Sequence, residues 1–486
     1  METEAAQGSR SAATGPGREE LAEVLDLIVE EARRYLGSLD ELPVRDPEAE
    51  TAAGSVGGDL PEEGSGAVAA LREVLERSAG FLASSGPRYF HFITGGVTPA
   101  ALGADWLASV VDQNSADWVG APLTSQLEAV AIRWLLELFG LPSGWGGVLT
   151  TGATMANFVA LAAARRWWGS QQGVDVDQEG LSGLPPVPVF ASGHLHPSDT
   201  KALAMLGIGR GRPKLLVRDA AGRIDLGALE RELSALGGAP SVVIASAGEV
   251  NAGDFDPIGA MAELAHAHGA WLHVDGAFGL FAAVSPRTRH LVEGVGQADS
   301  VIADGHKWLN VPYESGFAFV RDAGLLLPAF SLSAAYLPDP DDPHPGFLNR
   351  GPESSRRARS LAVWTTLRAY GRSGYRAIVE RCLDLAHRLA ERVDDAPDLE
   401  RLADVPLNIV CFRFRPAGVP EERLDDLNAR LGQAILEDGR VHFGTTVFEG
   451  RVAFRPAVVN WRTRERDVDL IVEVTRELGA RLVAAG

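Results

Sequence analysis

The chain is poor in cysteine and has no long uncharged apolar run. Among its 486 residues there are only two cysteines, Cys382 and Cys411, whereas a secreted domain held together by disulfides would use more. No stretch reaches the roughly 18 uncharged apolar residues of a membrane-spanning helix. Residues 1–20 also lack the apolar core of a signal peptide. We therefore expect a cytoplasmic protein without a membrane partner.

Positive charge is also scarce. The chain has 45 lysines and arginines against 65 aspartates and glutamates, which gives a formal net charge of -20. Nucleic acids and anionic membranes are bound by clustered lysine and arginine. The charge balance therefore argues against both classes of partner, but it does not identify a substrate.

Lysine is the rarest of the charged residues, with only Lys201, Lys214 and Lys307 in the whole chain. Arginine supplies the other positive charges, but its guanidinium stays protonated and cannot form an imine. A lysine retained in such a chain is a candidate for amine chemistry. We interpret Lys201 and Lys214 as surface or structural residues, because only Lys307 has support from its neighbours in the sequence.

The composition of the sequence and its pattern of apolar residues divide the chain into four regions. Residues 1–17 are small and polar, which predicts a disordered tail. Residues 18–66 contain an amphipathic helix and then a polar arm, and the apolar stripe of that helix predicts packing on a second subunit. Residues 67–370 and 371–486 predict a large domain and a small C-terminal domain.

Short apolar runs alternate with helical stretches in the large domain. This alternation predicts an α/β unit with a mostly parallel sheet, in which ligands bind at the carboxyl ends of the strands. The small domain shows helices and a few short strands, which predicts an α+β fold. The apolar runs of the large domain are 188–192, 214–219, 241–247, 270–275, 300–305 and 316–322.

Three segments place reactive side chains where strands are predicted to end. LHVDGAFG ends an apolar run with Asp275, and SVIADGHKWLN carries Lys307 just past the next run. In LTTGATMANFVAL, Gly152, Ala153 and Thr154 open a helix. The three segments would meet at one edge of a parallel sheet.

Pyridoxal 5'-phosphate (PLP) needs these three chemical parts. An amine binds its aldehyde, a carboxylate keeps its pyridine nitrogen protonated, and a helix N-terminus with free N–H groups holds its phosphate. Each part alone is common, since aspartate often caps a turn and TGAT often caps a helix. Together they predict a PLP site with Lys307 as a Schiff-base lysine and with no metal ion.

At these residues the chain resembles the group II PLP-dependent amino acid decarboxylases, which include aromatic-L-amino-acid, histidine and glutamate decarboxylases. The resemblance covers residues 70–480 and includes SGHLHPSDTKALAMLGIG, RARSLAVWTTLRAYG and TTVFEGRVAFRPAVVNWRTRERDVD. It implies the PLP-dependent transferase fold type I, which is aspartate aminotransferase-like, and a homodimer. It also implies a carboxy-lyase that converts an L-amino acid to its amine and CO2.

The resemblance assigns further cofactor contacts. It implies that His196 stacks on the ring of PLP, that Ala277 packs on the other face, and that Ser246 contacts the ring hydroxyl. His306 would lie near the phosphate. His194, two residues before His196, is an alternative stacking residue.

The family's proton donor is a tyrosine on a mobile loop, which corresponds here to residues 333–364. The position of this tyrosine falls on Phe347, whose ring cannot donate a proton, so Tyr336 or His344 is the alternative donor. Plant relatives with phenylalanine at this position are aldehyde synthases. Oxidative decarboxylation and deamination to an aldehyde is therefore an alternative outcome.

The resemblance also implies a substrate pocket. Phe92, Ile93 and Trp118, together with Phe347, would make this pocket apolar. The sequence therefore favours an aromatic or large apolar L-amino acid. Glu249 replaces a family threonine, and its role stays open.

Two other classes of protein share parts of this pattern. An aminotransferase would use the same aspartate and lysine with an arginine for the substrate carboxylate, for which Arg455 is the candidate. An assembly protein on an old enzyme fold would have no need of Lys307, Asp275 and His196, and their presence argues against this class.

Overall fold

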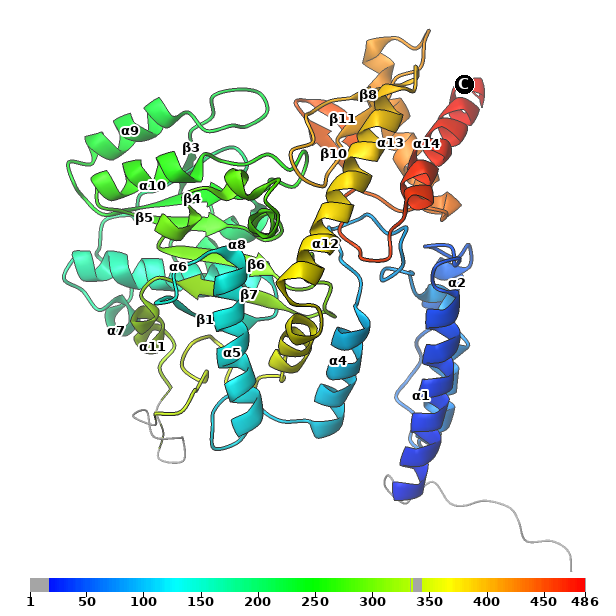
Figure 1. The fold of residues 1–486 in the computed structure, drawn as a ribbon, viewed down its shortest axis with the longest axis horizontal. Coiled ribbons are helices and arrows are strands. Elements are labelled where there is room, and N and C mark those ends of the chain that lie inside the picture. The colour runs from blue at the N-terminus through cyan, green and yellow to red at the C-terminus, as the bar shows by residue number, and fades with distance from the viewer. Residues whose placement is uncertain (1–16, 333, 335–342, 486) are drawn as a thin grey trace, which may run out of the picture.

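The computed structural model describes residues 17–332, 334 and 343–485, and a seven-stranded sheet lies at its centre (Figure 1). The strand order is β1-β7-β6-β5-β4-β2-β3. Strands β2 to β6 run parallel, and β7 is antiparallel to both of its neighbours, β1 and β6. This mixed, mostly parallel sheet confirms the predicted fold class. The strands are β1 (Gly146–Thr150), β2 (Val189–Ala191), β3 (Pro213–Leu215), β4 (Ser241–Ser246), β5 (Ala270–Asp275), β6 (Ser300–Asp304) and β7 (Gly316–Val320).

Burial explains why such short segments form strands. Every residue of β4, β5, β6 and β7 is buried, because helices cover the sheet as in other parallel sheets. Helix α6 (Ala153–Gln171) packs on β1, β5, β6 and β7, and α10 (Ile258–Ala267) packs on β4 and β5. Each apolar run named above contains or overlaps a strand, whereas β1 was not singled out from the sequence.

The large domain contains further helices, none of which, among the described residues, is long and apolar enough to cross a membrane. These helices are α4 (Pro99–Val111), α5 (Pro122–Phe139), α7 (Val176–Glu179), α8 (Pro197–Met205), α9 (Leu226–Ala235) and α11 (Leu326–Ala329).

A long helix, α12 (Ser360–Asp394), runs from the large domain into the C-terminal part of the chain (Figure 1). It kinks at Gly371, where φ is 58°, a left-handed conformation that favours glycine. The division that we propose between residues 370 and 371 falls at this kink. Beyond it lie a four-stranded antiparallel sheet, in the order β10-β11-β9-β8, and two helices. These elements are β8 (Leu399–Arg401), β9 (Phe412–Phe414), α13 (Glu421–Asp438), β10 (Thr445–Phe448), β11 (Arg451–Phe454) and α14 (Glu465–Ala485).

The N-terminal helices form a separate layer. Helix α1 (Arg18–Ser38) confirms the predicted amphipathic helix, and it packs against α3 (Ala67–Leu75). Figure 1 shows α1 standing apart from the seven-stranded sheet, near the short α2 (Ala49–Gly54). Leu21 and Leu25 on α1 stay 60% and 50% exposed.

A loop from the first hundred residues is clamped between the large domain and a C-terminal loop. A Cβ atom added to Gly95 would lie 1.6 Å from the carbonyl oxygen of Lys307, and one added to Gly96 would lie 2.5 Å from Nδ2 of Asn460. Asn460 also donates to two carbonyl oxygens of the turn before this loop. A side chain at Gly95 would therefore push the loop off the backbone of Lys307, and one at Gly96 would push it off Asn460.

Candidate active site

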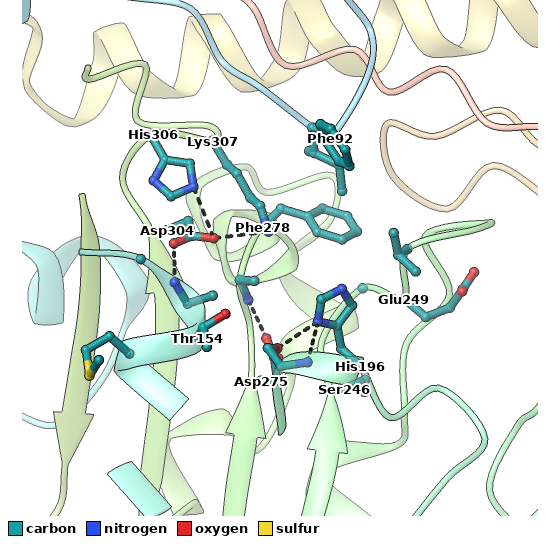
Figure 2. Close-up of a pocket in the computed structure, with 18 of the residues that line it drawn as sticks. Phe92, Thr154, His196, Ser246, Glu249, Asp275, Phe278, Asp304, His306 and Lys307 are labelled. Carbon is teal, nitrogen blue, oxygen red and sulfur yellow. Dashed lines mark hydrogen bonds and ion pairs between the residues drawn. The ribbon is translucent and has the colours of Figure 1, made fainter. Parts of the chain in front are cut away.

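A cavity of about 480 Å³ opens at the carboxyl ends of β4, β5 and β6 (Figure 2). Its volume is typical of small-molecule sites. Most of the residues that the sequence singled out come together here, from segments far apart in the chain. Those that line the cavity are Phe92, Ile93, Gly152, Ala153, Thr154, His196, Ser246, Asp275, Ala277, His306 and Lys307.

The first turn of α6 forms one wall of the cavity. Gly152 precedes the helix and offers no side-chain cap. The N–H of Ala153 donates to Oδ1 of Asp304 at 2.6 Å. The backbone of β7 packs closely against this turn, since a Cβ atom added to Gly316 would lie 2.5 Å from Cα of Gly152. The positive end of the helix therefore faces the cavity, as an anion site requires.

Lys307 projects into the cavity from the loop that follows β6 (Figure 2). Its Nζ lies 3.1 Å from Oδ2 of Asp304 and 5.9 Å from the centre of the Phe278 ring. Beside it, the ring of His306 stacks on Tyr313 at 4.3 Å. Burial lowers the pKa of His306, although Asp304 opposes this effect. The other two lysines, at 201 and 214, are exposed on the surface.

Asp275 ends β5 and is buried at the floor of the cavity. Its Oδ2 accepts from Nδ2 of Asn157 at 3.0 Å, and its Oδ1 accepts from the N–H of Ala277 at 3.0 Å. Burial alone would raise the pKa of Asp275, but the charge of His196 and these hydrogen bonds outweigh it and lower the pKa. Asp275 is therefore an anion.

His196 is the N-cap residue of α8 and lies beside Asp275 (Figure 2). Its Nδ1 accepts from the N–H of Ser198 at 3.2 Å and lies 2.7 Å from the Ser198 hydroxyl. Burial lowers the pKa of His196, and the charge of Asp275 opposes this effect. His194 also lines the cavity, and its buried Nε2 has no hydrogen-bond partner among the described residues.

Two predicted pocket residues do not line the cavity of this chain. Trp118 stacks on His344, with 4.4 Å between the ring centres. Phe347 is buried against the guanidinium groups of Arg350 and Arg356. Tyr336, the other candidate donor on this loop, lies outside the described residues.

Several residues of the cavity were not found from the sequence, among them Asp304, Phe278 and Tyr313. Asp304 ends β6 just as Asp275 ends β5, so the same strand-end signal could have found it. Phe278 and Tyr313 lie in irregular segments, where no periodic pattern marks a side chain as part of a site.

The groups around the cavity match the chemistry of PLP. An amine, a buried carboxylate and a helix N-terminus whose N-cap glycine has no side chain face the same space. Nδ1 of His306 and Nε2 of His194 are buried without a hydrogen-bond partner in the described residues. A ligand in the cavity could supply the partner of these two atoms. The residues therefore fit the cofactor.

Comparisons with known proteins agree with this chemistry. Residues 72–415 match the family described as the pyridoxal-dependent decarboxylase conserved domain. L-2,4-diaminobutyrate decarboxylase of Rhizobium meliloti is 32% identical over 437 residues, which cover 86% of this chain and 84% of that protein. Aromatic-L-amino-acid decarboxylase of Bacillus atrophaeus is 28% identical over 389 residues, which cover 79% of each chain.

A solved structure supports the fold. Oryza sativa TDC, determined with PLP and tryptamine, superimposes with a TM-score of 0.88 at 24% identity, and the match covers 96% of this chain and 99% of that one. The family match extends over most of the large domain and over the start of the small domain. The chain belongs to the pyridoxal-dependent decarboxylases, and it is a PLP-dependent amino acid decarboxylase.

Proposed function

We propose that this enzyme decarboxylates an L-amino acid with an aromatic or large apolar side chain and releases the amine and CO2. The observation that carries this proposal is the meeting of Lys307, Asp275 and the α6 N-terminus in one cavity with apolar walls. The relative from Bacillus atrophaeus, which is named for aromatic substrates, supports the substrate class.

Each charged residue has a proposed task. When bound, PLP supplies an electrophilic carbon for an amino group and an electron sink for the bond that breaks as CO2 leaves. Lys307 provides the amine that attaches the cofactor. Asp275 would hold a proton on the pyridine nitrogen by its charge, and His196 would cover one face of the ring while Ala277 would cover the other. Ser246 would contact the ring hydroxyl.

The phosphate would be held by the first turn of α6. Gly152, Ala153 and Thr154 present backbone N–H groups and a hydroxyl there, and His306 flanks this turn, since a Cβ added to Gly152 would lie 3.1 Å from its Cε1. Asp304 accepts the N–H of Ala153. This carboxylate and the phosphate would therefore both accept hydrogen bonds from the first turn of α6.

A proton must reach the substrate carbon after CO2 leaves. Among the described residues, Tyr313 brings a phenol to the cavity, where its hydroxyl lies 3.0 Å from the Thr94 hydroxyl. Tyr313 is therefore a candidate donor beside the loop residues Tyr336 and His344.

The walls favour an uncharged or positively charged substrate side chain. Phe92, Ile93, Val250 and Phe278 supply apolar surface, and no arginine lines the cavity within the described residues. Arg455, the candidate of the aminotransferase alternative, instead donates to the carbonyl of Val250. A distal carboxylate on the substrate would therefore lack a partner, which disfavours acidic amino acids.

A second substrate class has a specific observation in its favour. Glu249 and Glu314 line the cavity. The Glu249 carboxylate accepts the N–H groups of Asn251 and Ala252, and Glu314 pairs with Arg359, but the negative charge of Glu249, which meets no cation in these hydrogen bonds, would attract a distal ammonium group. The relative from Rhizobium meliloti, an L-2,4-diaminobutyrate decarboxylase, supports a diamino acid as this second candidate.

The aldehyde outcome is not favoured. A 4-hydroxyphenylacetaldehyde synthase of Rhodiola rosea has a similar structure, with a TM-score of 0.84, but at 22% identity this likeness concerns the fold alone. Phe347, which suggested this outcome, is buried away from the lining of the cavity in this chain.

We also propose a cytoplasmic homodimer. Its support is the exposed apolar surface on α1 and α4 and the burial of both cysteines as free thiols, because a reducing compartment keeps thiols free.

End-product analysis tests the proposed reaction. The PLP-loaded enzyme is incubated in air with aromatic, aliphatic, acidic and diamino L-amino acids, and CO2, amine, aldehyde and peroxide are measured together. We expect CO2 and amine in equal amounts from an aromatic or large apolar substrate. Amine from diaminobutyrate alone would favour the second class, and aldehyde with peroxide would overturn the non-oxidative reaction.

A further inference from the structure

A chain of hydrogen bonds runs behind Asp275, away from the cavity. Nδ2 of Asn157 donates to Asp275, so its Oδ1 is the acceptor for Nε2 of His273 at 3.0 Å. Burial lowers the pKa of His273 to about 4, so the ring is neutral and carries its one proton on Nε2. Nδ1 must then accept from the Ser300 hydroxyl at 2.8 Å, and that oxygen accepts from the indole of Trp271 at 3.0 Å. The indole N–H can only donate, so the Ser300 oxygen must accept from Trp271 and its proton must point to His273. The donor directions set by Asn157 and by Trp271 therefore agree.

A second carboxyl group, Asp199, lies against this chain. It is in the first turn of α8, it is completely buried, and neither carboxyl oxygen has a hydrogen-bond donor among the described residues. Asp199 lies against His273, and His273 and Asp275 are two residues apart on β5, so their side chains share one face of the sheet. The Asp199 and Asp275 carboxyl groups therefore interact, and Asp275 raises the pKa of Asp199. Nε2 of His273 lies 3.9 Å from Oδ1 of Asp199, but its proton is already directed to Asn157.

Two carboxyl groups in contact cannot both be ionised when both are buried. Asp275 receives two donated hydrogen bonds, from Asn157 and Ala277, whereas Asp199 receives none of comparable geometry. The negative charge therefore belongs on Asp275, and the proton belongs on Asp199.

The surroundings agree with this assignment. Burial and then the charge of Asp275 raise the pKa of Asp199 well above its ordinary value, and nearby backbone N–H groups lower it by less. The groups that face Asp199 are Asp275 and His273 from β5 and His196 from its own helix. None of them is a lysine or an arginine, and burial lowers the pKa of both histidines.

We propose that Asp199 is a positioning residue that carries the single proton of the Asp199–Asp275 pair and donates it to Asp275. Asp275 thereby stays an anion with its oxygens fixed toward the cavity. The effect on the cofactor rests on the proposed function, in which Asp275 pairs with the pyridine nitrogen, but the protonation of Asp199 does not.

Infrared spectroscopy of the apoenzyme in D2O at neutral pH tests the protonation. A protonated carboxyl group has a C=O stretch distinct from that of a carboxylate, and we expect Asp199→Asn to remove one such band from the wild-type spectrum. The matched control is Asp384→Asn, which changes an exposed carboxylate and should leave this band intact. A protonated-carboxyl band of unchanged intensity in Asp199→Asn would overturn the proposal.

Cofactor affinity tests the positioning role. Asp199→Asn keeps a neutral donor toward Asp275, whereas Asp199→Val fills the space without one. We expect the dissociation constant of PLP, measured by titration of the apoenzyme, to stay within about threefold in the asparagine variant and to rise roughly tenfold or more in the valine variant, since a hydrogen bond to a charged group is lost.

The outcomes separate the two proposals. Equal PLP affinity in the asparagine and valine variants, with both folded by circular dichroism, would overturn the positioning role. Loss of the infrared band together with a wild-type protein that binds no PLP would instead overturn the proposed function while the protonation of Asp199 stands.

Discussion

At the scale of single residues, Lys307 combines two properties that can be separated. Its amine can bond covalently to an aldehyde, and its charge pairs with Asp304 at 3.1 Å. Arginine would keep the charge and lose the covalent chemistry. One substitution, Lys307→Arg, can therefore separate the contribution of the amine chemistry to activity from that of the charge.

We predict that Lys307→Arg keeps the fold and loses the activity. The guanidinium preserves the ion pair with Asp304, but it cannot attach the cofactor, so kcat should fall by roughly a thousandfold or more. Decarboxylation assays with added PLP measure the loss, and reduction with borohydride followed by mass spectrometry should label Lys307 in the wild type only. Retained activity in the arginine variant would contradict the proposed role.

The buried His273 predicts a specific sensitivity to acid. Its pKa of about 4 in the folded protein lies below the ordinary value of 6.5, so the unfolded chain takes up a proton first as the pH falls. The stabilisation is therefore complete above pH 6.5 and is lost between pH 6.5 and 4, by about 3 kcal/mol. His273→Gln should reduce the loss in free energy of unfolding over this range by that amount. Urea unfolding of the apoenzyme at several pH values measures it, and an unchanged pH dependence would contradict the prediction.

Sequence reasoning at this scale found the residues with a strand-end or helix-start signal. Asp275, Lys307 and Gly152 were predicted from such signals, and the structure brings them to one cavity. Asp199 carries no signal of this kind, because an aspartate in the first turn of a helix is ordinarily a favourable surface residue. Its burial depends on how α8 packs against α6.

At the scale of elements, the buried ion pair between Arg356 and Glu128 connects the segment before α12 to α5. Arg356 donates to Oε1 of Glu128 on α5 at 2.7 Å and to the carbonyl of Leu149 on β1 at 2.9 Å. Glu128 in turn accepts the N–H of Leu149 at 3.0 Å. Both side chains of the pair are 2% exposed.

We predict that Arg356→Ala destabilises the protein by about 3–5 kcal/mol, because it leaves the buried Glu128 carboxylate without its partner. The neighbouring Arg357→Ala is the matched control. Arg357 pairs with Asp105 at the surface, with 39% and 29% of the two side chains exposed, so its loss should cost about 1 kcal/mol or less. Urea denaturation measures the free energy of unfolding of the two variants. A similar loss of stability in both would contradict the prediction that the buried pair contributes more than the exposed one.

The elements themselves were largely predictable, because burial on both faces of the sheet leaves continuous apolar runs in β4, β5 and β6. The division at residue 370 was not expected to fall inside a helix. A single glycine with φ of 58° lets α12 continue with a changed direction, and the helical pattern on either side does not reveal such a kink.

At the scale of the whole molecule, exposed apolar side chains lie on helices α1 and α4. On α4, Val110 is 73% exposed and Trp106 is 40% exposed, and Leu21 and Leu25 on α1 are exposed as well. Monomeric proteins rarely leave so many large apolar side chains in water on neighbouring turns. This distribution supports the proposed homodimer.

We predict that Val110→Glu weakens self-association by roughly tenfold or more, because a charge would be buried without a partner in the interface. The matched control is Val447→Glu, which changes a similarly exposed valine, 64% exposed, on β10 of the small domain. Analytical ultracentrifugation over a range of concentrations compares the two variants with the wild type. A monomeric wild type, or equal association in both variants, would contradict the prediction.

The clamped loop at Gly95 and Gly96 fixes the order in which this protein can be completed during synthesis. The loop is made early, yet it presses on the backbone of Lys307 and is held by Asn460. A ribosome that has translated only the seven-stranded sheet has therefore produced every residue that we propose to contact the cofactor, but not Asn460, which holds the turn before the loop. The contacts that Asn460 makes with this part of the chain can therefore form only after the last segment has been synthesised.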